Sequence, residues 1–275
     1  MMKQTLIATA VAGVFMLSAT PALADDAPAA PAASPLTFNV GVVSDYLFRG
    51  ISQTHGDPAL QGGIDYAFAN GFYVGTWASN ISWVKDYTNK GNVEVDLYGG
   101  YRGAFSNPDW TYDLGAIAYT YPGHGDANAF GASPTTTEVR AQVGYKWMSV
   151  KYSYVTSSHF VGWYSTTSSG KTDGSGYLEA NATYDLGNGW GAVGHVGHQT
   201  VKDLGIASYT DWNLGVTKDV GFGVVTLLYS DTNAKGDTGE AYNWPNKDFV
   251  AGTGSTSGYK NVSKGKAVLT FLKTF

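Results

Sequence analysis

The chain of 275 residues has no cysteine, few charged residues and no long apolar run beyond its first residues. Without cysteine, no disulfide can stabilise it. Charged residues make up 14% of the chain and the formal net charge is -5, so the clustered positive charge that nucleic-acid binding needs is missing. After residue 24 no run of about 18 apolar residues occurs, which excludes a transmembrane helix there. If the chain lies in a membrane, β-strands must cross it.

The first 24 residues have the three parts of a secretory signal peptide. Lys3 is the positive flank, residues 6–17 form a short apolar run, and Ala22-Leu23-Ala24 is a small-residue cleavage site. We therefore predict a cleaved signal peptide over residues 1–24. A Pro/Ala-rich leader over residues 25–35 and a single β-barrel domain over residues 36–275 complete the predicted organisation.

What the chain does have is glycine, aromatic residues and alternation. It contains 36 glycines, 19 tyrosines and 8 tryptophans, a composition typical of strands and turns. Alternating apolar and polar positions indicate half-exposed strands, because successive side chains point to opposite faces of a strand. The pattern predicts about twelve strands, an even number as in bacterial membrane barrels. These strands are expected near 36–49, 58–69, 72–80, 92–103, 109–121, 137–146, 148–156, 176–186, 190–199, 209–218, 222–231 and 264–275.

The links between these strands alternate between short and long. Short links are expected at residues 70–71, 106–108, 146–147, 188–189 and 219–221, and two of them are Asn-Gly, the strongest two-residue hairpin signal. Longer polar segments lie between them. Short periplasmic turns at one end and long extracellular loops at the other are typical of outer-membrane barrels.

Alternation alone also fits a soluble β-sandwich or a lipocalin-like barrel, because it does not tell which face points outward. The signal peptide, the loop asymmetry and the terminal Phe275 favour an all-β, antiparallel transmembrane barrel. A closing aromatic residue on an alternating strand resembles the signal that the barrel-assembly machinery reads, so we assign that role to Phe275. Two interfacial aromatic girdles are expected to include Trp77, Trp83, Trp110, Tyr121, Trp147, Trp190, Trp212, Tyr229 and Phe275.

Residues 44–81, SDYLFRGISQTHGDPALQGGIDYAFANGFYVGTWASNI, resemble the N-terminal signature of the TorF-type porin family. Further similarity lies in residues 119–123, YTYPG, in residues 178–184, LEANATY, and in the closing LTFLKTF. The resemblance covers essentially the whole mature domain. It implies an outer-membrane barrel and a pore in a Gram-negative bacterium, and it brings no substrate or catalytic residue.

Strand parity gives a set of candidate pore-lining residues on the charged faces. They are Asp45, Arg49, Asp65, Glu94, Asp96, Arg102, Asp113, Glu138, Arg140, Lys151, Glu179, Asp185 and Asp211. Asp45 and Arg49 are expected on one face of the first strand, with Asp65 near them on the next. Either a structural ion cluster or a constriction for solutes explains such a group. With Lys146 and Lys266 included, inward acids exceed inward bases by nine to six, which predicts a weak preference for cations.

Metal and catalytic chemistry finds little support in the sequence. His195 and His198 are three apart in a strand and therefore on opposite faces, so they cannot chelate one ion together. Residues 231–240, DTNAKGDTGE, only partly match a calcium loop, because Lys235 stands at a ligand position. We expect no catalytic, cofactor-binding or metal-binding residues.

The sequence thus predicts an outer-membrane porin for passive diffusion of small polar solutes or ions. Its expected partners are outer-membrane lipid, the assembly machinery and the solutes, with no nucleic acid. Two alternatives stay open: a plugged structural or adhesive barrel, and an outer-membrane hydrolase with an outward serine and histidine. The oligomeric state cannot be read from one sequence.

Overall fold

The computed structural model describes residues 34–124, 132–166, 169–248 and 258–275. The predicted signal peptide, and all of the predicted leader except its last two residues, lie outside these ranges. Among the described residues, no helix is long and apolar enough to cross a membrane.

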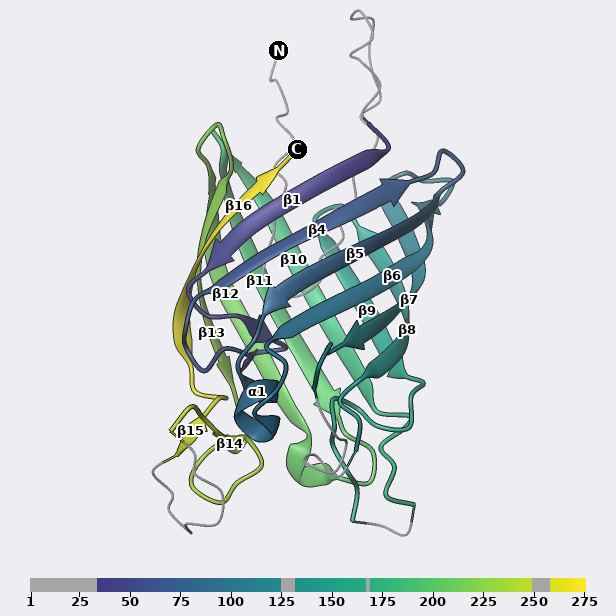
Figure 1. The fold of residues 1–275 in the computed structure, drawn as a ribbon. Helices are drawn as coiled ribbons and strands as arrows, with labels where there is room; N and C mark the ends of the chain where they lie inside the picture. The colour runs from purple at the N-terminus through teal and green to yellow at the C-terminus, as the bar shows by residue number, and fades with distance from the viewer. Residues whose placement is uncertain (1–33, 125–131, 167–168, 249–257) are drawn as a thin grey trace, which may run out of the picture.

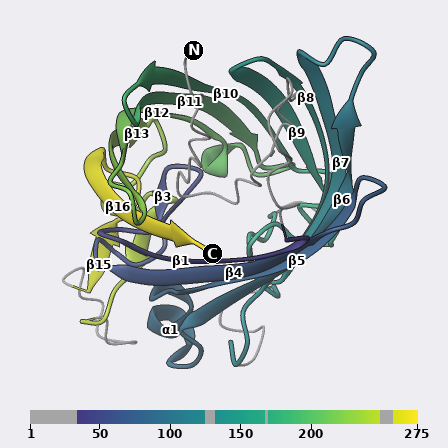
Figure 2. The same ribbon diagram turned by 90° about the horizontal axis from the view of Figure 1, so that it is seen from above.

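Twelve antiparallel strands form a closed barrel, as the alternation predicts (Figures 1 and 2). The strands of the wall are β1 (Leu36–Val43), β4 (Ala59–Ala67), β5 (Phe72–Asn80), β6 (Val93–Ala104), β7 (Trp110–Thr120), β8 (Thr136–Tyr145), β9 (Met148–Val155), β10 (Gly176–Gly187), β11 (Trp190–Thr200), β12 (Tyr209–Asp219), β13 (Val224–Thr232) and β16 (Lys266–Thr274). All twelve predicted strands are present, and the largest error is the end of the first, which stops at Val43 and not at residue 49.

Each strand of the wall pairs with its neighbour along the chain, and β1 closes the barrel against β16. In that seam Asn39 lies opposite Thr274 and Val43 lies opposite Thr270. Beyond the ladder, the backbone of Phe38 exchanges two hydrogen bonds with that of Phe275. Closure leaves no unpaired sheet edge, which a barrel surrounded by lipid requires.

Short links gather at one end of the barrel, which we call the short-turn end, and long loops gather at the other, the long-loop end (Figure 1). At the β10–β11 link, Asn188 and Gly189 both have positive φ (54° and 75°), as a type I′ turn requires. The start of β1 and the end of β16 lie at the short-turn end. The predicted arrangement of the links is confirmed.

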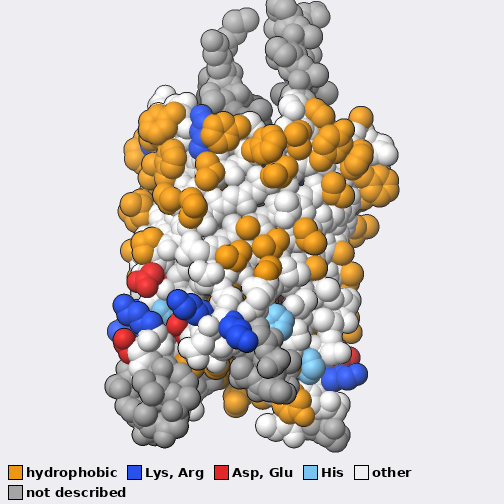
Figure 3. Space-filling view, viewed as in Figure 1, with side chains coloured by type: hydrophobic (Ala, Val, Ile, Leu, Met, Phe, Trp, Pro, Cys, Tyr) orange, Lys and Arg blue, Asp and Glu red, His pale blue; other side chains and the backbone are white. Residues whose placement is uncertain are grey.

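The apolar face of the wall points outward. Leu60, Leu97 and Leu214 are 62%, 56% and 64% exposed, whereas Glu94 and Asp211 on the opposite face are each 1% exposed. Apolar side chains gather on the wall from the short-turn end to the middle of the barrel, and most of the charged side chains on this face gather toward the long-loop end (Figure 3). An apolar belt around a polar interior is typical of a barrel that spans a membrane, and a soluble barrel would have the reverse.

The predicted girdle of aromatic side chains is correct only in part. Trp110, Trp147, Trp190, Trp212, Tyr229 and Phe275 are exposed on the outer surface. Trp83 and Tyr121 are buried at the long-loop end, with ring centroids 5.1 Å apart, and the ring of Trp77 packs edge-on against Tyr46 inside the barrel. The assignment of these three to a girdle was wrong because interior packing selects the same residue types.

The remaining elements are short. They are β2 (Leu47–Phe48), β3 (Ile51–Ser52), α1 (Trp83–Thr88), the 3-10 helix η2 (Gly205–Ala207), β14 (Asn243–Pro245) and β15 (Tyr259–Asn261). The helix α1 and the pair β14–β15 lie at the long-loop end (Figure 1). The pair β2–β3 lies inside the barrel, as the view down the axis shows (Figure 2).

Candidate functional site

The chain turns into the barrel directly after β1, and residues 44–57 form what we call the luminal hairpin. Its two short strands β2 and β3 pair through Leu47 with Ser52 and Phe48 with Ile51. The turn residues Arg49 and Gly50 both have positive φ, 50° and 79°. Positive φ at both positions defines a type I′ turn, and an arginine rarely adopts it. Arg49, the residue with this unusual backbone conformation, lies at the tip of the hairpin.

The tip of the hairpin touches the wall at β12 and β13, which lie three and two strands from β1 around the barrel. A Cβ atom added to Gly50 would lie 2.5 Å from the Cγ2 atom of Thr232 and 2.8 Å from the Cβ atom of Asp211. Only glycine fits so close to β12 and β13 at this backbone conformation. The hairpin consequently crosses the lumen and narrows it.

Arg49 holds the tip in place. Its Nη2 lies 2.7 Å from Glu138 Oε2 on β8, and its Nη1 donates to Gln199 Oε1 on β11 at 2.7 Å. The guanidinium also stacks on the ring of Tyr177, with Cζ 4.3 Å from the centroid. Charge-assisted bonds and ring stacking together fix an arginine more firmly than either alone.

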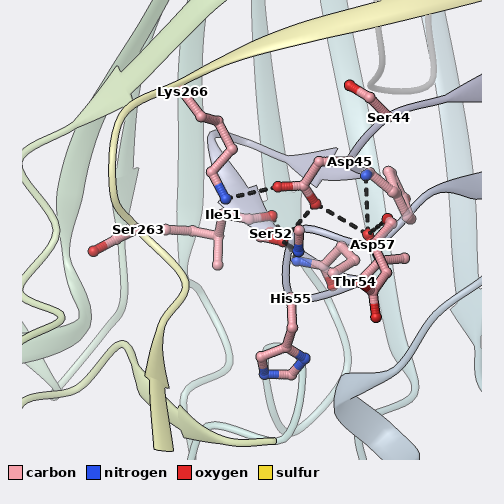
Figure 4. Close-up of polar contacts among 12 residues, drawn as sticks. Ser44, Asp45, Ile51, Ser52, Thr54, His55, Asp57, Ser263 and Lys266 are labelled. Atoms are coloured by element: carbon pink, nitrogen blue, oxygen red, sulfur yellow. Dashed lines mark hydrogen bonds and ion pairs between the residues drawn. The ribbon is translucent and has the colours of Figure 1, made fainter.

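Asp45 holds the base of the hairpin (Figure 4). Its Oδ1 accepts hydrogen bonds from the hydroxyls of Ser52 at 2.6 Å and Thr54 at 3.0 Å. Its Oδ2 lies 2.6 Å from the Nζ of Lys266, which begins the last strand. The carboxylate thus connects the two arms of the hairpin and ties them to the seam of the barrel.

Apolar packing joins the hairpin to the loops at the long-loop end. Tyr46, Leu47 and Ile51 are at most 5% exposed and belong to one buried cluster with Trp83 of α1 and Trp244 of β14. The cluster also includes inward side chains of the wall, such as Tyr119 of β7 and Val268 of β16. The hairpin is consequently part of a packed interior layer rather than a free loop.

The structure does not join Asp45, Arg49 and Asp65 into one ion cluster, and that prediction was wrong. Asp45 pairs with Lys266, Arg49 pairs with Glu138, and Asp65 accepts a hydrogen bond from the hydroxyl of Tyr98 at 2.7 Å. The prediction assumed that the first strand runs straight to residue 49. Because the chain turns inward at Ser44, Asp45 and Arg49 face different parts of the wall.

Three more of the candidate residues lie on neighbouring strands, β6 to β8, around Tyr73 of β5. The hydroxyl of Tyr73 donates to Asp113 Oδ1 at 2.7 Å. The guanidinium of Arg102 lies over the ring of Tyr73, with Cζ 5.0 Å from the centroid. Arg140 donates to the same hydroxyl from the other side, at 3.5 Å. The hydroxyl of Tyr73 therefore lies between the guanidinium of Arg140 and the carboxylate of Asp113.

Glu94 and Asp96 lie beneath the luminal hairpin, at 1% and 0% exposure. Glu94 Oε1 accepts from the hydroxyl of Tyr46 at 3.3 Å. Within the described residues, neither oxygen of Asp96 has a hydrogen-bond partner, nor does Glu94 Oε2. Both carboxyl groups face inward, as predicted from parity, but the hairpin covers them.

The far wall holds a chain of polar contacts across β9 to β12. Lys151 Nζ lies 2.7 Å from Glu179 Oε1, and His195 Nε2 lies 3.0 Å from Asp211 Oδ2. The hydroxyl of Tyr177 donates to Asp211 Oδ1 at 2.8 Å. Basic and acidic side chains therefore alternate along this part of the lumen.

Two of the residues predicted to face inward, Asp185 and Lys146, do not line this part of the lumen. Asp185 lies near the short-turn end, where it is exposed and its Oδ1 accepts from the backbone of Gly187 at 2.7 Å. Lys146, counted among the inward bases, occupies the turn before β9 with φ 51° and lies half-exposed beside Asp109. A turn residue leaves the alternation of its strand, so parity does not place Lys146 in the lumen.

A chamber of about 60 Å³ lies beside the tip of the hairpin. This is room for roughly four water molecules. Arg49 and Gly50 line it on the hairpin side, and Arg140, Lys151 and His195 are among the residues that line it on the wall side. The site therefore consists of a polar wall, a hairpin that crosses the lumen, and a small charged chamber between them.

Sequence reasoning missed the hairpin and the residues that receive it, Tyr177 and Gln199. A signal for the hairpin was present, because Tyr46, Leu47 and Phe48 are consecutive and apolar. A strand between lipid and water cannot accept such a run on both faces.

Comparison with solved structures shows similarity to barrels of the outer membrane. The KdgM porin has a TM-score of 0.48 and 8% identity, over 87% of this chain and 98% of that chain. The NanC porin has a TM-score of 0.47 and 10% identity, over the same shares of the two chains. LpxR from Salmonella typhimurium has a TM-score of 0.42 and 10% identity, over 87% of this chain and 99% of that chain.

A search of curated proteins finds no match. A family model described as "Bacterial protein of unknown function (Gcw_chp)" matches residues 28–268, most of the chain. The chain belongs to the Gcw_chp family of bacterial proteins of unknown function.

Proposed function

We propose that this protein is an outer-membrane channel for the passive diffusion of small polar solutes or ions. The observation that carries the proposal is a chamber lined by charged side chains inside a closed barrel whose outer wall is apolar. A polar interior inside a lipid-facing wall can conduct hydrophilic solutes across the membrane. The resemblance of residues 44–81 to the TorF-type porins agrees with this proposal.

The luminal hairpin sets the size of solute that the channel admits. It crosses the lumen, and the space beside its tip holds only a few water molecules. We therefore propose that the seated hairpin favours ions and small solutes over larger ones. Larger solutes need the hairpin to move, and its ion pairs at tip and base oppose that movement.

We further propose a weak preference for cations. With Lys146 placed in a turn and Asp185 exposed near the short-turn end, the inward acids number eight against five bases. Arg49, Lys151 and Lys266 each pair with an acid, whereas Asp65 accepts a hydrogen bond from the hydroxyl of Tyr98 and forms no ion pair within the described residues. An excess of fixed negative charge enriches cations in a narrow lumen.

Planar-bilayer recording tests both statements. The refolded protein is expected to give discrete conductance steps, and under a salt gradient the reversal potential should have the sign that cations produce. A reversal potential of the opposite sign contradicts the cation preference and leaves the channel intact. Silence from protein shown to be folded contradicts the channel.

A plugged structural barrel is the second candidate, and the interior layer favours it. The hairpin, α1 and β14 pack into one apolar cluster inside the long-loop half. If the wild-type protein is silent but a variant lacking the Arg49 contacts conducts, the hairpin is a plug in a barrel that can open. If neither conducts, the barrel is structural.

We also propose that the protein is not a hydrolase. Of the two histidines of β11, His195 faces the lumen and His198 faces outward, where its Nδ1 contacts the hydroxyl of Thr210 at 2.9 Å. An esterase assay with an inhibitor that modifies serine checks this proposal. Turnover that the inhibitor abolishes would contradict it.

A further inference from the structure

Within the described residues, each basic side chain that lines the chamber lies against an acid, with one exception. Arg49 pairs with Glu138, Lys151 pairs with Glu179, and His195 lies against Asp211. The fourth basic side chain that lines the chamber is Arg140 of β8. Among the described residues, no carboxylate lies within ion-pair distance of it.

Arg140 is buried and poorly satisfied where it stands. The residue is 9% exposed, and within the part of the chain that the structure describes its one side-chain hydrogen bond goes to the hydroxyl of Tyr73 at the long distance of 3.5 Å. That hydroxyl donates its own proton to Asp113, so Tyr73 stands between the guanidinium and the acid. Asp113 and Asp96 act on Arg140 only across a distance.

A guanidinium in this position calls for an anion. It has five N–H donors in a planar fork, and it does not lose its charge at any ordinary pH. Burying an unpaired charge is costly, whereas a fork of N–H groups matches the two oxygens of a carboxylate. Because Arg140 lines the chamber, the partner missing from the protein has space to enter from the lumen.

We propose that the chamber is a binding subsite for a small carboxylate, whose oxygens occupy the fork of Arg140. The chamber of about 60 Å³ has room for an ion as small as formate or acetate. The subsite rests on the proposed channel, because the ligand reaches Arg140 through the lumen. It does not conflict with a weak cation preference, since the acid excess acts along the whole lumen and Arg140 acts at one position.

Carbon-13 acetate is the probe, and its binding to the folded protein in detergent is measured by saturation-transfer NMR. Wild-type protein is expected to bind acetate saturably. Arg140→Gln should weaken binding by about tenfold or more, the scale of one lost charge-assisted contact. Arg140→Lys should bind with intermediate affinity, because it keeps the charge and loses the fork. Lys146→Gln removes one positive charge from the turn outside the chamber and should bind as the wild type does.

The same proteins are then recorded in bilayers at constant ionic strength as acetate replaces chloride. Acetate should reduce the current of wild type and leave that of Arg140→Gln unchanged. Binding without any current supports the subsite and contradicts the channel. Current without saturable binding, or equal affinity in wild type and folded Arg140→Gln, overturns the subsite and leaves the channel.

Discussion

Arg49 and Glu138, which are 89 residues apart in the sequence, form a 2.7 Å ion pair across the lumen. The pair joins the tip of the luminal hairpin to β8, and both side chains are buried at 8% and 1% exposure. Little of the tip is held by backbone pairing, because β2 and β3 are two residues each. The tip therefore depends on side-chain contacts.

Arg49→Gln should release the hairpin. Loss of the charged contacts should lower the free energy of hairpin opening by about 2 kcal/mol, typical of a hydrogen bond to a charged group. This raises the open population by about 30-fold. Faster hydrogen exchange at Leu47 and Ile51 and a larger conductance are the expected readings. In a double-mutant cycle, Glu138→Gln should add little to Arg49→Gln, and fully additive effects would contradict the pairing.

Gly197→Ala should displace Tyr177 from the lumen wall. A Cβ atom at Gly197 would lie 2.0 Å from the hydroxyl oxygen of Tyr177, so the ring must move away from Asp211 and Arg49. We expect a destabilisation of about 1–3 kcal/mol, as for overpacking in general, measured by urea unfolding in detergent micelles. Gly194→Ala on the same strand is the control, because its Cβ would meet nothing closer than 3.8 Å. Equal effects of the two changes would count against this account.

Stability at the long-loop end should depend on pH through two buried groups whose pKa values are shifted in opposite directions. Burial lowers the pKa of His55 to about 4 and raises the pKa of Asp86 to about 6. The folded state resists protonating His55, so that contribution is complete above the unfolded pKa of about 6.5 and is lost as pH falls toward 4. The folded state resists ionising Asp86, so that contribution is lost as pH rises from about 3.8 to 6. Between pH 4 and 6 the two slopes oppose each other.

His55 Nδ1 lies 3.3 Å from Asp86 Oδ2, so each variant also removes this contact. The direction of the remaining group's pH dependence should nevertheless become visible when its partner is removed. Asp86→Asn should make residues 82–88 less protected against hydrogen exchange at pH 4.5 than at pH 7, once exchange rates are corrected for pH. His55→Gln should show the reverse order. The opposite pKa shifts of His55 and Asp86 would be contradicted if protection of the wild type changed steeply between pH 4.5 and 7. They would also be contradicted if protection of both variants changed with pH in the same direction.

Leu214→Arg tests whether the outer belt lies in lipid. Leu214 is 64% exposed near the middle of β12, and an arginine at the midplane of a bilayer costs about 2–4 kcal/mol in a membrane barrel. Unfolding from lipid vesicles in urea should show this loss. Ile206→Arg, at a residue 70% exposed in η2 of a long loop, should have little effect. A soluble barrel would tolerate both substitutions equally.

The wall of the barrel could be predicted from sequence because its signals are local. In the run Val93, Glu94, Val95 and Asp96, every second side chain points into the barrel. The Asn188-Gly189 turn fixes the end of a strand. Both depend only on neighbouring residues. Outward and inward could not be told apart from alternation, and the exposed Leu97 settles that question.

The site could not be predicted in the same way, because its contacts are between distant segments. Residues 44–52 have the β-propensity of a longer first strand, and nothing local indicates that Arg49 reaches Gln199, 150 residues away. The three apolar residues from Tyr46 to Phe48 do not fit a lipid-facing strand, which was the available warning. Strand alternation correctly predicted the inward direction of Glu94, Asp96 and Glu179, because these residues lie within regular strands.

The salt bridge between Asp45 and Lys266 has a consequence for the order of assembly. Asp45 follows the first strand of the wall and Lys266 begins the last, and these two strands meet only in the closing seam. The base of the hairpin thus gains this ion pair when the final strand docks, and not before. Closure of the barrel and attachment of the hairpin inside it therefore occur in the same step. The lumen is already narrowed when assembly is complete.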